Sequence, residues 1–141
     1  MTIPKLIVPY DPDFLGDGFT VPMPALSESL KSHAFANGAA VPYTHFSLVM
    51  HARRRVAIVA ANNIDAARKV QVAGGLTWHM DERIGEFQLG PEVYADNQLD
   101  RGHMVRREDV LWGSVPEARR ANESTFFYSN AAPQHQNFNQ D

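Results

Sequence analysis

The chain has 141 residues, a hydrophobic fraction of 44%, a charged fraction of 21% and no cysteine. This length predicts one globular domain with a real hydrophobic core, and the absence of cysteine excludes disulfides and thiolate metal sites. The formal net charge of −3 argues mildly against a nucleic-acid binder, because phosphate contacts need local positive charge. No signal peptide and no apolar run of membrane-spanning length is evident, so the expected location is the cytoplasm.

Residues 1–42 are rich in proline and glycine, which predicts an irregular, extended arm with at most a short helix near residues 26–35. Disorder is one interpretation of such a stretch. The alternative, that the arm packs on the core, is favoured by the apolar residues spaced along it, namely Leu6, Ile7, Val8, Phe14, Leu15, Phe19, Val21 and Leu30. No repeat or linker divides the chain, so we treat residues 1–141 as a single domain.

A hairpin is expected in the next part of the chain. Apolar and polar residues alternate over residues 43–50, as in a half-buried strand, and residues 56–60 are continuously apolar, as in a buried strand. Three arginines, Arg53 to Arg55, fall at the turn and form either a solvated turn or a phosphate-binding patch. His45 and His51 are expected on the strand surface rather than as metal ligands, since no carboxylate or second histidine is spaced to join them.

The following part is expected to hold a return strand, a loop, a helix and a buried strand. Residues 75–87 indicate the return strand, and residues 104–113 the loop. Ser114-Val-Pro-Glu117 is a capping-box pattern with proline in the first turn, which predicts a short helix to about residue 122. The aromatic and β-branched residues at 125–128 predict a buried strand.

Residue types that carry chemistry are concentrated in Asp100-Arg101-Gly102-His103 and in a polar run over residues 129–140. A neutral imidazole can take a proton from water near neutral pH, and glycine lets a backbone or ligand approach closely. The carboxamide and carbonyl oxygens of the later run are ligands of the kind that Mg²⁺ prefers. A base and a hard-metal site together are the minimal equipment for hydrolysing a phosphodiester.

Positive charge gathers near this motif although the chain as a whole is acidic. A locally basic cleft on an acidic body suits an enzyme that must release its product, so the charge neither favours nor excludes a nucleic-acid substrate. The arginines concerned are Arg101, Arg106, Arg107, Arg119 and Arg120.

Segments over most of the chain match a known family in the same order. They are residues 43–50, 78–84, 99–103, 105–107, 109–113, 127–134 and 138–140. In these segments the chain resembles the DNA/RNA non-specific endonucleases related to endonuclease G, which are ββα-metal (His-Me finger) nucleases. The resemblance implies an α+β fold, mainly antiparallel sheet with few helices, in which the strand entering the histidine pairs with the strand leading to the asparagine. It also implies DNA and RNA as partners and Mg²⁺ as cofactor, with Mn²⁺ or another divalent cation as the alternative.

The resemblance assigns roles to individual residues. His103 is the general base that deprotonates the attacking water, and Asn139 is the metal ligand at the start of the α element. Asn130 supports the site by orienting the histidine loop. Arg101 either contacts the phosphate or has an interior role. Further substrate contacts are expected from Arg83, Arg106 and Arg107.

Two departures from the family pattern bear on these expectations. The arginine that family members place shortly before the tryptophan segment has no counterpart before Trp78, where Arg68 and Lys69 are the nearest cations. The chain stops at Asp141, so the metal helix that follows the asparagine in the family, with its glutamate, is expected to be absent from this polypeptide. We therefore expect a second polypeptide or a homodimer to complete the fold.

Two classes of function remain open. The first is a Mg²⁺-dependent, sugar-non-specific endonuclease, or the N-terminal part of one. The second is a non-catalytic fragment that binds nucleic acid or a partner chain and needs a second chain for activity. A zinc site is a third interpretation that the spacing does not favour; it would draw on His33, His45, His79, His103 and His135.

Overall fold

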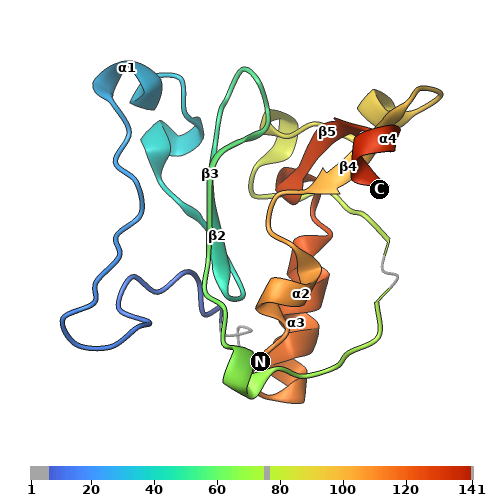
Figure 1. Ribbon diagram of the computed structural model, residues 1–141. Helices are drawn as coiled ribbons and strands as arrows, with labels where there is room; N and C mark the ends of the chain where they lie inside the picture. The colour runs from blue at the N-terminus through green and yellow to red at the C-terminus, as the bar shows by residue number, and fades with distance from the viewer. Residues whose placement is uncertain (1–6, 75–76, 141) are drawn as a thin grey trace, which may run out of the picture.

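Two small antiparallel sheets form the framework of the structure, a computed structural model that describes residues 7–74 and 77–140. The first sheet has the order β1-β2-β3, and the second pairs β4 with β5 (Figure 1). With short helices beside them, the sheets confirm the expected α+β class and are consistent with a ββα-metal nuclease fold. The strands are β1 (Val41–Tyr43), β2 (Phe46–Met50), β3 (Ala57–Asn62), β4 (Leu99–His103) and β5 (Ala131–His135).

The longest helix is α3 (Val115–Thr125), which begins at the predicted capping box. The Ser114 hydroxyl accepts a hydrogen bond from Glu117 N, and the Glu117 carboxylate accepts one from Ser114 N, both at 3.3 Å. The other α-helices are α1 (Glu28–Lys31), α2 (Arg107–Val110) and α4 (Gln136–Asn139). The 3-10 helices are η1 (Phe35–Gly38), η2 (Ala66–Arg68), η3 (Gly85–Phe87), η4 (Pro91–Tyr94) and η5 (Tyr128–Asn130).

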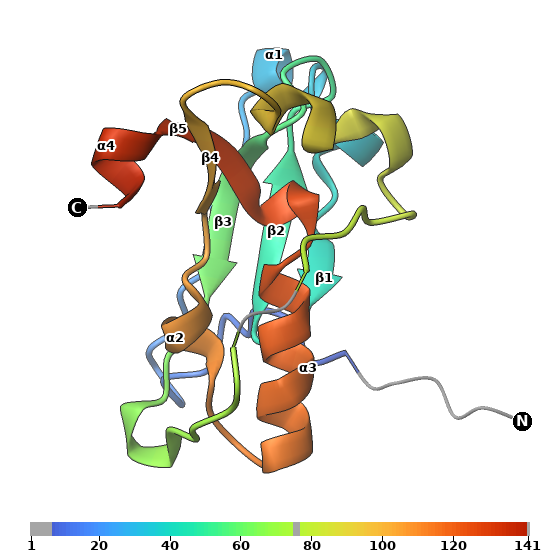
Figure 2. The ribbon, with the colours of Figure 1, turned by 90° about the vertical axis from the view of Figure 1, so that its right-hand side faces the viewer.

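The core lies around β2, the central strand of the first sheet, which is buried along its whole length. α3 lies against one face of this sheet, on the same side as β4 and β5 (Figures 1 and 2), and buries Ala118 and Ala121. The buried cluster reaches Val105, close after His103, so the core supports the chain that follows the motif. Its other large members include Phe46, Leu48, Met50, Ile84 and Val110.

The described part of the N-terminal arm contacts the first sheet. His45 N donates a hydrogen bond to Val8 O (2.7 Å), and Asp11 N donates one to the side-chain oxygen of Asn63 (2.7 Å). The short helix α1 falls inside the range where a helix was expected.

The stretch predicted as one strand over residues 43–50 is two strands. β1 and β2 are antiparallel partners, and the chain reverses between them at His45, whose φ is 71°. The His45 side chain is buried, with Nδ1 2.8 Å from Val110 O and Nε2 2.7 Å from Glu117 Oε1. The expected surface position of His45 was wrong, since both ring nitrogens find partners in the interior. The hairpin itself is confirmed, as β2 pairs with β3, but β3 is an edge strand and only partly buried, so the expected buried position of residues 56–60 was wrong.

The predicted strand over residues 125–128 was also wrong. Thr125 is the last residue of α3, its hydroxyl donates to Asn122 O (2.9 Å), and Phe126 N donates to Glu123 O (3.1 Å). α3 ends at Thr125, Phe127 forms only an isolated bridge with His79, and η5 begins at Tyr128, so residue types that favour strands form no strand here, because β propensity depends strongly on context. The partner of β4 is β5, further along the chain.

Three other segments differ from expectation. Residues 75 and 76 of the expected return strand lie outside the described residues, and residues 77–87 form one isolated bridge (His79 to Phe127) and then η3. The loop expected over residues 104–113 contains α2, and one further turn of helix that was not predicted, α4, ends at Asn139. Among the residues described, no helix combines the length and hydrophobicity needed to cross a membrane.

Candidate active site

The motif Asp100-Arg101-Gly102-His103 lies on β4, and its antiparallel pairing with β5 fixes where the side chains lie. This pairing of the strand entering the histidine with the strand leading to Asn139 was expected and is confirmed. Asp100 lies opposite Gln134 in the register. A Cβ on Gly102 would come within 2.1 Å of the Gln134 side chain, so the glycine is what allows Gln134 to lie across the strand.

His103 lies half-buried among aromatic rings at the end of β4. Its ring centroid is 4.7 Å from that of Trp78 and 5.1 Å from that of Phe126. Burial lowers the pKa of His103, and the positive charge of Arg107 lowers it further, so the imidazole is neutral at pH 7. Its Nε2 atom is buried and has no hydrogen-bond partner among the described residues. A neutral ring with an unused nitrogen is suited to proton transfer.

Asn130 is fully buried in η5 and ties three parts of the chain together. Its side-chain oxygen accepts from Val105 N (2.9 Å), and its side-chain nitrogen donates to Val105 O and Thr125 O (both 3.0 Å). Its backbone carbonyl accepts from Met104 N (2.8 Å). The two residues that follow His103 are therefore fixed to the end of α3.

A polar cavity of about 290 Å³ opens beside β4. Trp78 is shared between this cavity and the His103 environment, since its ring also packs on His103. Asn139 reaches the cavity from α4, and its amide nitrogen lies 3.2 Å from Asp100 Oδ2. The lining residues are Trp78, Tyr94, Asn97, Leu99, Asp100, Arg101 and Asn139.

The oxygen atoms of Asp100 and Asn139 are the donors that a cation could use here. Mg²⁺ commonly binds through one or two carboxylates and keeps several waters, so the Asp100 carboxylate is a ligand of the expected kind, although its Oδ2 atom accepts hydrogen bonds from the amide nitrogens of Asn139 and Gln140 in this structure. No group of three or more histidine, aspartate or glutamate side chains suited to a metal occurs within residues 7–74 and 77–140. The histidine-based zinc site, which the spacing did not favour, gains no support.

The arginines near the motif differ in how many of their donors are already used. Arg101 is exposed at the cavity, with its guanidinium 6.0 Å from the Trp78 ring and 3.4 Å from the Tyr128 hydroxyl. Arg106 makes one ion pair, with Asp109 (3.2 Å), and its side chain is 71% exposed. Arg107 is anchored by three groups: it donates to the Asn122 side chain, the Glu108 carboxylate and Val72 O.

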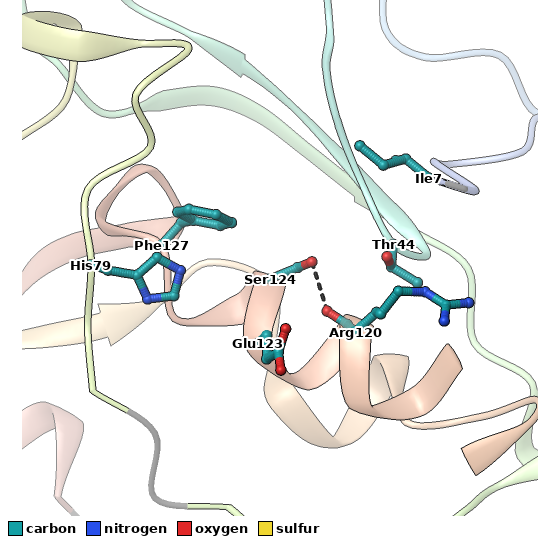
Figure 3. Close-up of a pocket in the computed structure, with 7 residues that line it drawn as sticks. All are labelled: Ile7, Thr44, His79, Arg120, Glu123, Ser124 and Phe127. Atoms are coloured by element: carbon teal, nitrogen blue, oxygen red, sulfur yellow. Dashed lines mark hydrogen bonds between the residues drawn. The ribbon is translucent and has the colours of Figure 1, made fainter. Parts of the chain in front are cut away.

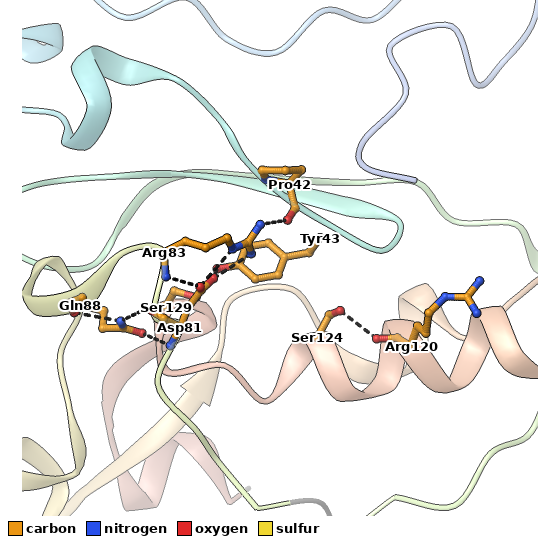
Figure 4. Close-up of polar contacts among 9 residues, drawn as sticks. Pro42, Tyr43, Asp81, Arg83, Gln88, Arg120, Ser124 and Ser129 are labelled. Atoms are coloured by element: carbon orange, nitrogen blue, oxygen red, sulfur yellow. Dashed lines mark hydrogen bonds and ion pairs between the residues drawn. The ribbon is translucent and has the colours of Figure 1, made fainter. Parts of the chain in front are cut away.

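Arg83 lies in a different environment from the cavity (Figure 4). Its guanidinium binds both oxygens of Asp81 (3.0 and 2.8 Å) and donates to Pro42 O (2.9 Å). Burial alone would raise the pKa of Asp81, but hydrogen bonds from Arg83 and Tyr43 hold it below its usual value. The Tyr43 hydroxyl also contacts the Ser129 hydroxyl (2.6 Å), which links the network to Asn130's neighbour. The described cavity lining does not include Arg83.

The chain was compared with known proteins. Residues 27–141 match the family model described as DNA/RNA non-specific endonuclease. The chain belongs to this family. It is also 40% identical over 147 residues to the uncharacterized protein y4fB of Sinorhizobium fredii (strain NBRC 101917 / NGR234). That match covers 93% of this chain and 22% of the relative, so the chain spans about a fifth of the relative's length.

Two aromatic residues of this candidate nuclease site were not singled out from the sequence. Trp78 stood only within a matched segment, and Tyr94 carried no signal at all, because η4 meets β4 only in the folded chain. The Tyr94 hydroxyl is buried without a hydrogen-bond partner among the described residues, and burial raises its pKa to about 12. The Tyr94 side chain therefore lines the cavity with its hydroxyl neutral and buried.

A second hollow, of about 300 Å³, lies between α3 and the β1–β2 turn (Figure 3). Its surface is mainly apolar, and none of its described lining residues belongs to the endonuclease motif. The residues that line it are Ile7, Thr44, His79, Arg120, Glu123, Ser124 and Phe127. Of the residues expected to carry the chemistry, Arg101 and Asn139 line the polar cavity beside β4, whereas His103 and Asn130 are not among its described lining residues.

Proposed function

We propose that this chain is a divalent-cation-dependent endonuclease that hydrolyses phosphodiester bonds in DNA and RNA. The observation that carries the proposal is a neutral His103 packed on Trp78, which also lines the cavity containing Arg101 and Asn139. Membership of the endonuclease family supports it.

His103 is the general base in this proposal. Its imidazole takes a proton from a water molecule as that water attacks phosphorus in line with the leaving 3′-oxygen. The lowered pKa keeps the ring available for this step at neutral pH. Asn130 fixes the residues that follow and so holds the ring in position.

Arg101 is the cation placed to contact the scissile phosphate, because it is exposed at the cavity. Its charge stabilises the negative charge that develops on phosphate oxygens in the transition state. Arg106 is sufficiently exposed to contact the nucleic-acid backbone at a phosphate further from the bond that is cut. The N–H groups of Arg83 and Arg107 already donate hydrogen bonds within the protein. We therefore assign Arg83 to holding Asp81. We assign Arg107 to holding α2 and to lowering the pKa of His103.

Asp100 and Asn139 would hold the cation through their side-chain oxygens. Mg²⁺, with Mn²⁺ as the alternative, would neutralise charge on the phosphate and the leaving oxygen. In this structure the side-chain amide nitrogens of Asn139 and Gln140 donate hydrogen bonds to Asp100, which keeps the two candidate metal ligands, Asp100 and Asn139, close together at the cavity.

A second polypeptide or a second copy of the chain is part of the proposal. Phe138 stands next to Asn139 on α4 and is 77% exposed, so it is an apolar group that a second chain could cover. Light scattering tests the association: Phe138→Ser should lower the mass of any assembly. A wild-type chain that stays monomeric at all concentrations, with no companion, would contradict it.

The experiment for the activity uses supercoiled DNA and a structured RNA with increasing Mg²⁺. We expect nicking of both, and no nicking when EDTA is present. A chain that binds both nucleic acids at every Mg²⁺ concentration but cuts neither would support the non-catalytic alternative.

A further inference from the structure

The turn between β2 and β3 has a backbone that is fixed by one imidazole. His51 Nδ1 accepts hydrogen bonds from both Arg53 N and Arg54 N (3.2 Å each), and His51 O accepts from Arg55 N (2.7 Å). An Nδ1 atom that accepts must be unprotonated. Loss of solvent contact lowers the pKa of His51, and the charges of Arg54, His33 and Arg53 lower it further, which favours that state.

Two arginine side chains on this hydrogen-bonded turn have no partner among the described residues. Arg53 and Arg54 are exposed, and their guanidinium groups make no ion pair or hydrogen bond with any residue that the structure describes. Of the arginines discussed above, Arg83, Arg106 and Arg107 each bind a carboxylate, whereas Arg101 is exposed at the polar cavity. Two adjacent free guanidinium groups on a preorganised backbone are suited to a polyanion.

The turn lies at the same end of the molecule as β4, β5 and α4 (Figures 1 and 2). Arg55 O accepts a hydrogen bond from Leu89 N (3.1 Å), which joins the turn to the segment leading into η4. η4 ends at Tyr94, a wall of the polar cavity. A backbone hydrogen bond and the short helix η4 therefore connect the turn to the candidate active site.

We propose that Arg53 and Arg54 form a second contact for the sugar–phosphate backbone of a nucleic acid whose scissile phosphate lies in the polar cavity. This inference rests on the proposed function and adds to it a contact away from the bond that is cut. Such contacts add affinity without reading sequence, in keeping with a non-specific nuclease.

The test measures binding of a labelled DNA duplex in EDTA over a range of salt concentrations. Each lost phosphate contact lowers the slope of log affinity against log salt by about 0.9 for duplex DNA, so Arg53→Gln/Arg54→Gln should lower it by about 1.8. Arg54→Gln alone should lower it by about half as much. The matched control is Arg119→Gln, which removes an exposed arginine on α3; Arg119 is near the motif in sequence but is not among the described lining residues of the polar cavity, so the slope should stay unchanged.

The outcomes separate this inference from the proposed function. A wild-type slope in the double variant, as expected if the turn instead docks an acidic protein, overturns the role of the turn and leaves the nuclease proposal standing. An equal fall with Arg119→Gln overturns it as well, because the effect would then be general charge. Failure of the wild-type chain to bind the duplex at any salt concentration overturns both proposals.

Discussion

The side-chain amide of Asn130 binds both the N–H (2.9 Å) and the C=O (3.0 Å) of Val105. Val105 itself is buried in the core, two residues after His103. The Asn130 amide, acting as both acceptor and donor, therefore fixes the backbone just after β4, the strand that bears the proposed base.

Asn130→Ala should destabilise the chain and reduce cleavage. Each buried polar group left without a partner costs about 1–3 kcal/mol, and the substitution leaves three such groups, on Val105 and Thr125. Urea unfolding should show a loss of at least about 3 kcal/mol. Asn137→Ala, at an exposed position, is the control. A variant as stable as wild type would mean that the amide does not fix this turn.

The acid limb of the activity profile should lie below pH 6.5, the ordinary value for histidine, because the pKa of His103 is lowered. The base must be neutral to act, so cleavage is lost as pH falls through this pKa and reaches a plateau above it. Arg107→Gln removes one of the two causes that lower the pKa of His103, so the acid limb should move to higher pH. Burial of His103 remains, so part of the lowering of its pKa should persist. Arg119→Gln should leave the limb in place. An unchanged limb in Arg107→Gln would remove Arg107 from this role.

Gly102→Ala should destabilise the sheet by about 1–3 kcal/mol, since the new Cβ overlaps the Gln134 side chain. Shortening that side chain should relieve the overlap, so Gly102→Ala/Gln134→Ala should recover part of the lost stability. Thermal unfolding of the four proteins in this cycle gives the coupling directly. Additive losses in the double variant would show that Gln134 is not the obstacle.

Local patterns predicted the elements that depend on neighbours in sequence. The capping box of α3 and the hairpin of β2 and β3 are of this kind. The strand predicted over residues 125–128 failed because α3 ends at Thr125 and η5 begins at Tyr128, and tertiary context outweighs the preference of aromatic residues for strands. The contacts of Arg83 could likewise be predicted only in part from neighbours in sequence. Its partner Asp81 is two residues away, but its hydrogen bond to Pro42 O forms only in the folded chain.

The matched family segments predicted more of the candidate site than residue spacing could. They singled out His103, Asn130 and Asn139, which lie 36 residues or less apart in sequence and on three different elements. The wall formed by Trp78 and Tyr94 was missed, because each comes from a separate segment and meets β4 only through tertiary packing.

Asn139→Ala should raise the Mg²⁺ concentration needed for half-maximal cleavage more than it weakens nucleic-acid binding. The reason is that phosphate contacts are expected mainly from arginines, whereas Asn139 supplies oxygen to the cation. Cleavage measured across a Mg²⁺ titration, with binding measured in EDTA, separates the two. Asn137→Ala again serves as the control. An equal loss of cleavage at every Mg²⁺ concentration would contradict the role of Asn139 as a ligand.

The central claim is that His103 is the general base, and His103→Ala tests it most directly. The variant should retain its far-ultraviolet circular dichroism and its duplex binding in EDTA, and plasmid nicking should fall by about 10²-fold or more. Added imidazole should restore part of the nicking, since the substitution leaves space between Trp78 and Phe126 for a free base. Near-normal nicking by a folded His103→Ala chain would contradict the claim.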